Sequence, residues 1–232
     1  MALAFHPDDL AISRSLPSYR STAAARPLWR GRIHQAGFVA SIPAGAYLVA
    51  SATTTLARTA LALYAVTWTA MFGASACYHL LSRGERSRLW LRRADHSAIF
   101  LHIAGGYAPF CLLALPRQVG VPVLAVVAAS ATAGVALKLT RLSPGRSAGT
   151  RLYLPMGWVM APTLPLLAPA LGWRGVSLVV SAGVVYSLGA CCLFRKSPDP
   201  RPAVFGYHEV WHTCTVVAGI LQFAALASLN AG

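Results

Sequence analysis

Two histidines in the last quarter of the chain have the spacing of metal ligands. His208 and His212 are four residues apart, so on a helix they lie one above the other on the same face. Two imidazoles in that arrangement can bind one zinc ion, and His79 could supply a third nitrogen. Three protein ligands leave a fourth position for water, which is the pattern of a catalytic zinc site, and zinc lowers the pKa of that water to about 7.

Two further side chains would complete the chemistry of such a site. A carboxylate such as Asp95 could hold or deprotonate the water. Ser75 precedes His79 by four residues and so shares its helical face, where the hydroxyl could donate a hydrogen bond to an oxyanion. These residue types together predict hydrolysis of an amide or ester, with Asp95 and Ser75 as catalytic residues.

The segment 208–212 also reads His-Glu-Val-Trp-His, which is the H-E-x-x-H signature of zinc proteases with Glu209 as the base. An intramembrane metalloprotease is therefore the alternative. Such enzymes usually take a third ligand from downstream, but the 20 residues after His212 contain no Asp, Glu, His or Lys, and Cys214 is too close on the same helix. We expect a ligand from upstream instead, and we expect Glu209 to face the cytoplasm at a helix N-terminus, where negative charge is favourable.

The elements that position these residues are predicted from the gaps between charged residues. Only 11% of the 232 residues are charged and 56% are hydrophobic, whereas soluble domains carry about 25% charged residues. Seven stretches of at least 20 residues lack Asp, Glu, Lys and Arg, and each could cross the roughly 30 Å hydrocarbon layer as a helix. They are 33–57, 59–82, 96–116, 118–137, 152–173, 175–194 and 210–232. None alternates as barrel strands do, so we predict an all-α bundle of seven transmembrane helices.

The net charge of +14 would suit a nucleic-acid-binding protein, but the basic residues are placed as in a membrane protein. The N-terminal tail and the second, fourth and sixth loops hold 17 of the 20 Lys and Arg residues, and the alternate loops hold Arg58, Arg117 and Arg174. Because positive charge collects on the cytoplasmic side, we predict a cytoplasmic N-terminus, an outside C-terminus and no nucleic-acid partner. Residues 1–30 are expected to form a poorly ordered basic tail, and residues 31–232 the membrane domain.

The candidate site residues share one depth in this topology. His79 ends the second span, Asp95 opens the third, and His208 and His212 open the seventh. All four therefore lie near the cytoplasmic border. Because the topology was derived from the basic loops without these residues, the agreement supports the site independently.

The other histidines and the prolines of the spans have ordinary explanations. A lone membrane histidine more often packs or hydrogen bonds than binds a metal, which we expect for His34 and His102. His102 follows Asp95 by seven residues and could line the same cavity deeper in the membrane. His96 is expected to point away from Asp95, toward the membrane interface. Prolines within the spans should kink helices, and they are Pro43, Pro109, Pro155, Pro162 and Pro165.

Five motifs carry a family resemblance: Ser75-Ala-Cys-Tyr-His79, Arg92-Arg-Ala-Asp95-His96-Ser-Ala-Ile99, Ile103-Ala-Gly-Gly-Tyr107-Ala-Pro109-Phe110, Tyr153-Leu-Pro-Met-Gly157-Trp158 and Gly206-Tyr-His208-Glu-Val-Trp-His212. They resemble the bacterial hemolysin III family, which belongs with the progestin and adipoQ receptors, over about residues 30–229. The resemblance implies a seven-helix fold with its N-terminus inside and a zinc ion held by His79, His208 and His212. It also implies that Asp95 contacts zinc-bound water and that Ser75 lies beside the site. Two departures are Gly105-Gly-Tyr-Ala-Pro109 in place of the family's G-T-Y-T-P, and Gln222 where many relatives have His or another polar residue.

Two functional hypotheses follow. The first is a zinc-dependent hydrolase of a membrane lipid amide or ester in the plasma membrane, and the resemblance connects it with alkaline ceramidases, which hydrolyse a lipid amide. The second is a non-enzymatic membrane protein with a structural zinc, acting as a membrane-state regulator, a receptor-like protein or a pore-forming cytolysin. Membrane lipids are the expected partners, and a homo-oligomer stays open in both cases.

Overall fold

The computed structural model describes residues 27–141 and 150–229, and within these ranges the ordered elements are helices without strands. The predicted tail 1–30 falls mostly outside the described residues. The long helices are α1 (Arg32–Ala50), α2 (Thr55–Leu81), α3 (Glu85–Pro109), α4 (Arg117–Arg141), α6 (Ala168–Arg195) and α7 (Tyr207–Leu229). Shorter turns are η3 (Phe110–Ala114), η4 (Thr150–Leu152), α5 (Tyr153–Gly157) and η5 (Ala161–Leu167). The all-α prediction is confirmed.

Six helical segments of the described residues are long and apolar enough to cross a membrane, one of them the 43-residue run Tyr153–Arg195. Helices satisfy every backbone hydrogen bond internally, which a lipid environment requires. Large apolar side chains cover the outside of the bundle, a distribution that suits lipid rather than water. Examples are Leu63, Val66, Leu101, Val126, Leu188 and Ile220.

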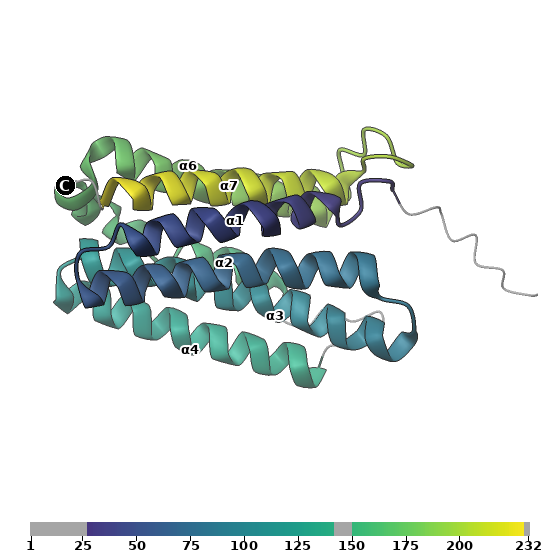
Figure 1. Ribbon diagram of the computed structural model, residues 1–232, viewed down its shortest axis with the longest axis horizontal. Coiled ribbons are helices and arrows are strands. Elements are labelled where there is room, and N and C mark those ends of the chain that lie inside the picture. The colour runs from purple at the N-terminus through teal and green to yellow at the C-terminus, as the bar shows by residue number, and fades with distance from the viewer. Residues whose placement is uncertain (1–26, 142–149, 230–232) are drawn as a thin grey trace, which may run out of the picture.

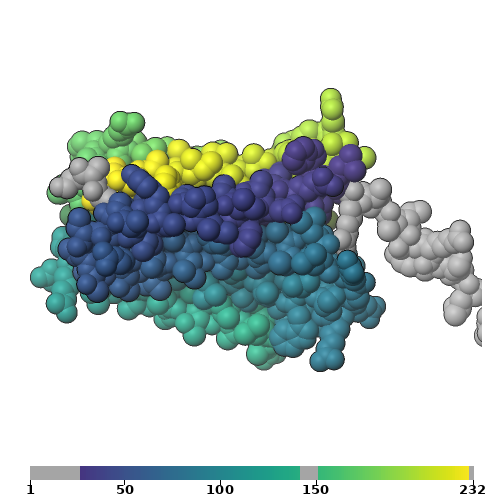
Figure 2. All heavy atoms as spheres, in the orientation of Figure 1, coloured from purple at the N-terminus to yellow at the C-terminus, as the bar shows by residue number. Residues whose placement is uncertain are grey.

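The long helices pack in the pairs α1–α2, α2–α3, α3–α4 and α6–α7, and α1 also packs against α7, which joins the first and last helices. Figure 2 shows α1 in purple and α7 in yellow lying against each other on one face. The start of α1, the end of α2, the start of α3 and the start of α7 meet at one end of the bundle, the right end of Figure 1. Residues distant in sequence therefore reach a common site at this end.

The first loop lies earlier than predicted. Helix α1 ends at Ala50 and α2 begins at Thr55, so the predicted span 33–57 runs past a turn that contains no charged residue. The Thr54 side chain caps α2 by accepting a hydrogen bond from the amide of Ala57 at 3.1 Å. Arg58, which the charge pattern placed in the loop, lies in the first turn of α2 and donates to the carbonyl of Ala52.

Helix α3 begins about ten residues before the predicted span. It starts at Glu85 and takes in most of the basic segment that was predicted as a loop. Asp95 was expected to open the third helix, but it lies well inside α3. The helix extends past the charge-free stretch because arginines at a helix end can hold their charged heads in water while the backbone stays helical.

The predicted helix 152–173 is broken rather than kinked. Only a short α-helical turn, α5, forms before the chain becomes 3-10 helical in η5, where Pro162 and Pro165 remove backbone donors. Gly172, with φ of 65°, then interrupts the run inside α6. The Trp158 indole donates to the Ser187 hydroxyl at 2.9 Å, so the two parts of the run lie beside each other.

A row of aromatic side chains along α2 continues to His34 in α1, near the site. The rings of Tyr64 and Trp68 are stacked with centroids 5.4 Å apart, and Trp68 and Phe72 follow at 5.8 Å. Phe72 in turn lies 5.0 Å from the imidazole of His34 in α1. These buried aromatic pairs favour one packing of α1 on α2.

Candidate metal centre

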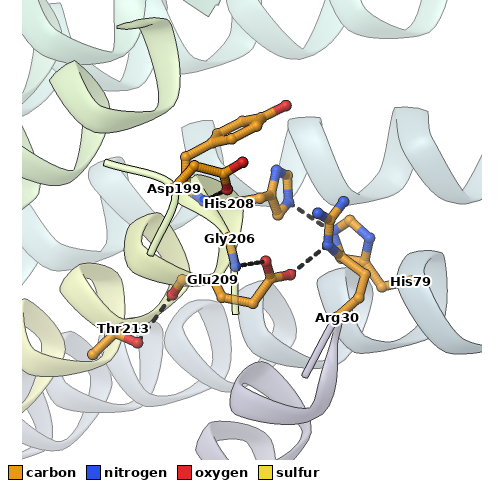
Figure 3. Close-up of polar contacts among 8 residues, drawn as sticks. Arg30, His79, Asp199, Gly206, His208, Glu209 and Thr213 are labelled. Atoms are coloured by element: carbon orange, nitrogen blue, oxygen red, sulfur yellow. Dashed lines mark hydrogen bonds and ion pairs between the residues drawn. The ribbon is translucent and has the colours of Figure 1, made fainter. Parts of the chain in front are cut away.

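Three histidines from two helices meet at the end of the bundle. His79 lies near the end of α2, and His208 and His212 lie in the first turns of α7. One ligand-type nitrogen from each of them lies within 4.8 Å of the other two. The Nε2 atoms of His79 and His208 are 3.2 Å apart (Figure 3). The structure thus brings together the three residues that the sequence predicted as ligands.

The geometry of the three imidazoles fits a zinc ion. Two nitrogens bound to one ion at about 2.0–2.1 Å with tetrahedral angles would lie about 3.3 Å apart, close to the His79–His208 separation. His212 is 2% exposed, and its Nδ1 is buried without a hydrogen-bond partner in the described part of the chain. In this structure the His79–His208 separation is also that of a hydrogen bond between two imidazole nitrogens.

The middle residue of the H-E-x-x-H string has a structural partner. Glu209 is fully buried, and one of its carboxylate oxygens forms an ion pair with Arg30, just before α1. The other oxygen accepts a hydrogen bond from the Gly206 amide at 2.9 Å. Figure 3 shows this carboxylate between Gly206 and Arg30. Glu209 lies at a helix N-terminus as expected, but the expectation that it faces the cytoplasm is wrong, since the ion pair draws it inside.

A second carboxylate holds the start of α7. Asp199 accepts a hydrogen bond from the amide of Tyr207, the first residue of the helix, at 2.9 Å. The first amides of a helix have no partner within the helix, and a carboxylate there also interacts favourably with the helix dipole. Glu209 and Asp199 therefore orient the turn that carries His208.

A glycine allows α1 to approach His79. Gly31 has φ of 81°, a left-handed conformation that other residues rarely adopt, and it precedes the first residue of α1. A Cβ at this position would lie 2.7 Å from the Cβ of His79. Gly31 therefore brings Arg30 over the site while leaving space for the ligand.

His34 packs directly against the candidate ligand His212. Its ring stacks on that of His212, with centroids 3.7 Å apart and an interplanar angle of 7°. Its Nε2 lies 2.7 Å from the Thr215 hydroxyl, and that hydroxyl donates to the carbonyl of His212. The hydroxyl has one hydrogen, so it accepts from His34. His34 packs and hydrogen bonds as predicted, but the sequence did not indicate that its partner is a candidate ligand.

Asp95 and Ser75 line the same cavity as the three histidines. Asp95 is 8% exposed and Ser75 is 2% exposed. The His96 Nδ1 lies 3.3 Å from an Asp95 oxygen, so the expectation that His96 points away from Asp95 is wrong. Tyr153 fixes this part of α3 because its hydroxyl donates to the carbonyl of His96 at 2.8 Å.

The cavity has a volume of about 830 Å³ and extends from the histidines into the bundle. This size is within the range of about 300–1,000 Å³ typical of ligand pockets. His102 lines its inner part, as predicted, with its Nε2 3.1 Å from the Tyr186 hydroxyl. Gln222 also lines it and donates to the carbonyl of Gly106. The cavity is therefore large enough for a small-molecule ligand, with the three histidines at one end.

The chain is similar over most of its length to proteins of one known family. The family model described as "Haemolysin-III related" matches residues 22–223. The chain belongs to the hemolysin III family. Together with the six apolar helical segments, this makes it a multi-span membrane protein. The predicted family is confirmed.

Named relatives extend the comparison. The chain is 31% identical to Hemolysin-3 of Bacillus cereus over 194 residues, which cover 82% of this chain and 85% of the relative. It is 28% identical to the Hemolysin-3 homolog of Bacillus subtilis (strain 168), with 82% and 87% covered. It is 25% identical to the Heptahelical transmembrane protein ADIPOR1 of Oryza sativa subsp. japonica, with 67% and 45% covered. The last similarity supports the connection to adipoQ receptor-like proteins.

Arg30 and Thr215 are the site neighbours that sequence reasoning missed. Arg30 was counted only as a tail charge, although it ends that tail directly before the first span. Thr215 lies three residues after His212 and therefore near it on the helix. Position along the helix could have indicated Thr215, whereas no local signal pairs Arg30 with Glu209, 179 residues away.

Proposed function

We propose that this member of the hemolysin III family is a zinc-dependent hydrolase of a membrane lipid amide or ester in the plasma membrane. One observation carries the proposal: three imidazoles close enough to share an ion line one cavity together with a buried carboxylate and a buried hydroxyl. Three protein ligands leave a position for water, as catalytic zinc sites do.

Each site residue has a role in this proposal. His79, His208 and His212 would hold zinc, which when bound supplies a water of lowered pKa and polarises a carbonyl. Asp95 orients the attacking water, accepts its proton and returns a proton to the leaving group. The Ser75 hydroxyl donates a hydrogen bond to the carbonyl oxygen as negative charge develops there.

The topology that we propose has seven crossings, with the N-terminus in the cytoplasm. The run Tyr153–Arg195 would cross twice, which is supported by the break at Gly172 and by the hydrogen bond between Trp158 and Ser187. A straight helix of 29 residues, the separation of this pair, would be about 44 Å long and would keep them apart. The excess of basic residues at the site end supports its cytoplasmic location.

A non-enzymatic role is the second candidate. The Bacillus relatives are named Hemolysin-3 and Hemolysin-3 homolog. The histidines come from α2 and α7, so a bound zinc would also connect these helices. In that case the zinc would stabilise the bundle without turnover. The two candidates differ in one measurable property, which is hydrolysis by the zinc-loaded protein.

The test combines metal analysis with a substrate screen. Wild-type protein should contain about one zinc per chain and hydrolyse at least one lipid amide or ester. His208→Ala should lose zinc and turnover, whereas Asp95→Asn should keep zinc and lose roughly 10²–10⁴-fold in turnover. Thr59→Ala is the matched control, because the Thr59 hydroxyl bonds only within α2, to the Thr55 carbonyl. Equal turnover by wild type and both site variants would refute the hydrolase, and zinc binding without turnover would favour the second candidate.

A further inference from the structure

Basic side chains outnumber acidic ones in the lining of the cavity that holds the candidate metal centre. Among the residues that the structure describes, five basic side chains line it, with Asp95 as the acidic one. The basic residues are Arg30, Arg88, Arg92, Arg151 and Lys196. A cavity with one sign of charge attracts ligands of the opposite sign because its low-dielectric walls concentrate the field.

These cations come from separate elements that meet at the histidines. Arg88 is in the first turn of α3, Arg151 is in η4, and Lys196 directly follows α6. All three are exposed, so they can reach a ligand held at the opening. Arg30 is engaged by Glu209, and its role is to position the site rather than to attract a ligand.

Basic residues are preferred on the cytoplasmic side of membrane proteins, which explains why the charge at this end is positive. It does not explain why some of these basic side chains line the cavity. Arg86 and Arg195 lie at the same end and are equally exposed, yet neither lines the cavity. Arg88 and Lys196 differ from them in facing it. Substitutions at Arg88 and Lys196 can therefore be compared with substitutions at Arg86 and Arg195, to distinguish attraction into the cavity from attraction to the charged end of the bundle.

The inner wall has the opposite character. Apolar side chains line it below the histidines, including Met71, Ile103, Phe110, Met160 and Val179. An apolar wall favours a hydrocarbon chain by the area it removes from water. A ligand that fits both parts has a long apolar chain and an anionic head.

We infer that the cavity binds a lipid with a phosphate-bearing, net anionic headgroup, which Arg88, Arg151 and Lys196 hold beside the histidines. Guanidinium groups bind phosphate oxygens through two parallel hydrogen bonds, and an ammonium adds a point charge. The inference rests on the proposed function for the identity of the substrate. Binding itself requires no turnover, so a lipid that binds and is not cleaved would contradict the proposed function alone.

The experiment measures lipid binding to the purified full chain in a neutral detergent. The probes are a monoacylglycerol phosphate, the phosphocholine lipid with the same acyl chain, the uncharged monoacylglycerol, and inorganic phosphate alone. The phosphate lipid should bind about tenfold or more tightly than the other two lipids. The uncharged lipid has no phosphate to accept a charge-assisted hydrogen bond, and the quaternary ammonium of the phosphocholine lipid offsets the negative charge of its phosphate. Its affinity should fall with added salt.

Two double variants decide between the cavity and the surface. Arg88→Gln/Lys196→Gln should weaken binding of the phosphate lipid about tenfold or more. Arg86→Gln/Arg195→Gln removes the same charge from the same end and should leave affinity within about twofold of wild type. Unchanged zinc content and melting temperature in both variants would show that they are folded.

Three results would overturn the inference. Equal losses in the two double variants would assign the attraction to the membrane surface. Equal affinity for the phosphate and phosphocholine lipids would remove the requirement for net negative charge. Inorganic phosphate that binds as tightly as the phosphate lipid would show that the ligand is the free ion and that the apolar wall contributes nothing.

Discussion

The ion pair between Arg30 and Glu209 gives the most discriminating test of how the site is built. The Glu209 side chain is 0% exposed and that of Arg30 is 23% exposed. Removing one partner of a buried pair costs about 3–5 kcal/mol, because the other charge stays buried without compensation. The variants Glu209→Gln and Arg30→Gln should therefore lose different amounts of stability, since the charge that remains in each has different access to water.

Glu209→Gln leaves Arg30 partly solvated and keeps an oxygen that can accept from the Gly206 amide. We expect a loss of about 2–3 kcal/mol, at or below the lower limit for a buried pair. At roughly 2–4 °C per kcal/mol, the melting temperature should fall by about 4–12 °C. Arg30→Gln leaves a fully buried carboxylate and should cost more, about 3–5 kcal/mol.

The assay is thermal unfolding of the purified protein in detergent at one fixed zinc concentration, because bound ligand shifts the melting temperature. The double variant Arg30→Gln/Glu209→Gln should be less destabilised than the sum of the two singles, which is the signature of a direct interaction. Asp199→Asn is the control. It keeps an oxygen for the Tyr207 amide at the same helix start, and Asp199 is exposed, so the loss should be below about 1 kcal/mol.

Two results would refute this reasoning. If Glu209→Gln abolished turnover while its melting temperature stayed at the wild-type value, Glu209 would act as the base of an H-E-x-x-H enzyme and the ion pair would have no structural role. A double variant whose loss equals the sum of the two single losses would likewise contradict the contact between the two side chains.

Three further predictions concern the surroundings of the candidate ligands. Gly31→Ala should destabilise the protein by about 1–3 kcal/mol in thermal unfolding, because the added methyl group meets His79 and the left-handed backbone strains a side chain; an unchanged melting temperature would count against the close approach. Thr215→Val should weaken zinc affinity by about 10–100-fold in a chelator competition, since it removes the hydroxyl that accepts from His34. Thr213→Val, whose hydroxyl bonds only within α7, should bind zinc as wild type does. Removal of zinc by a chelator should lower the melting temperature, and added zinc should restore it; no shift would argue against a metal that connects two helices.

Much of the site could be predicted because its signals are local. The four-residue spacing of His208 and His212 places both on one helical face wherever the helix packs. The basic residues beside His79 and Asp95 indicate that these positions share one end of the bundle. Depth in a membrane is a single coordinate, and composition along the chain determines it well.

Helix boundaries were less accurate, for a definite reason. Charge gaps mark where a chain can be buried in lipid, but a helix ends where backbone amides and carbonyls find other partners. Thr54 caps α2 without any charge nearby, and Glu85 begins α3 within a basic stretch. The proline-rich segment after Tyr153 was apolar enough for one helix, yet Pro162 and Pro165 withhold the donors that a continuous helix needs.

The sequence by itself determined that this chain forms apolar helices, which end of them is basic, and which histidines can meet there. Only the tertiary structure decided what surrounds those histidines: Arg30 on Glu209, His34 on His212, and His96 beside Asp95. Each of these depends on how α1 packs between α2 and α7 or on the rotation of α3. Composition sets the depth of a residue, whereas the direction of its side chain around the helix axis is set by packing against helices that are distant in sequence.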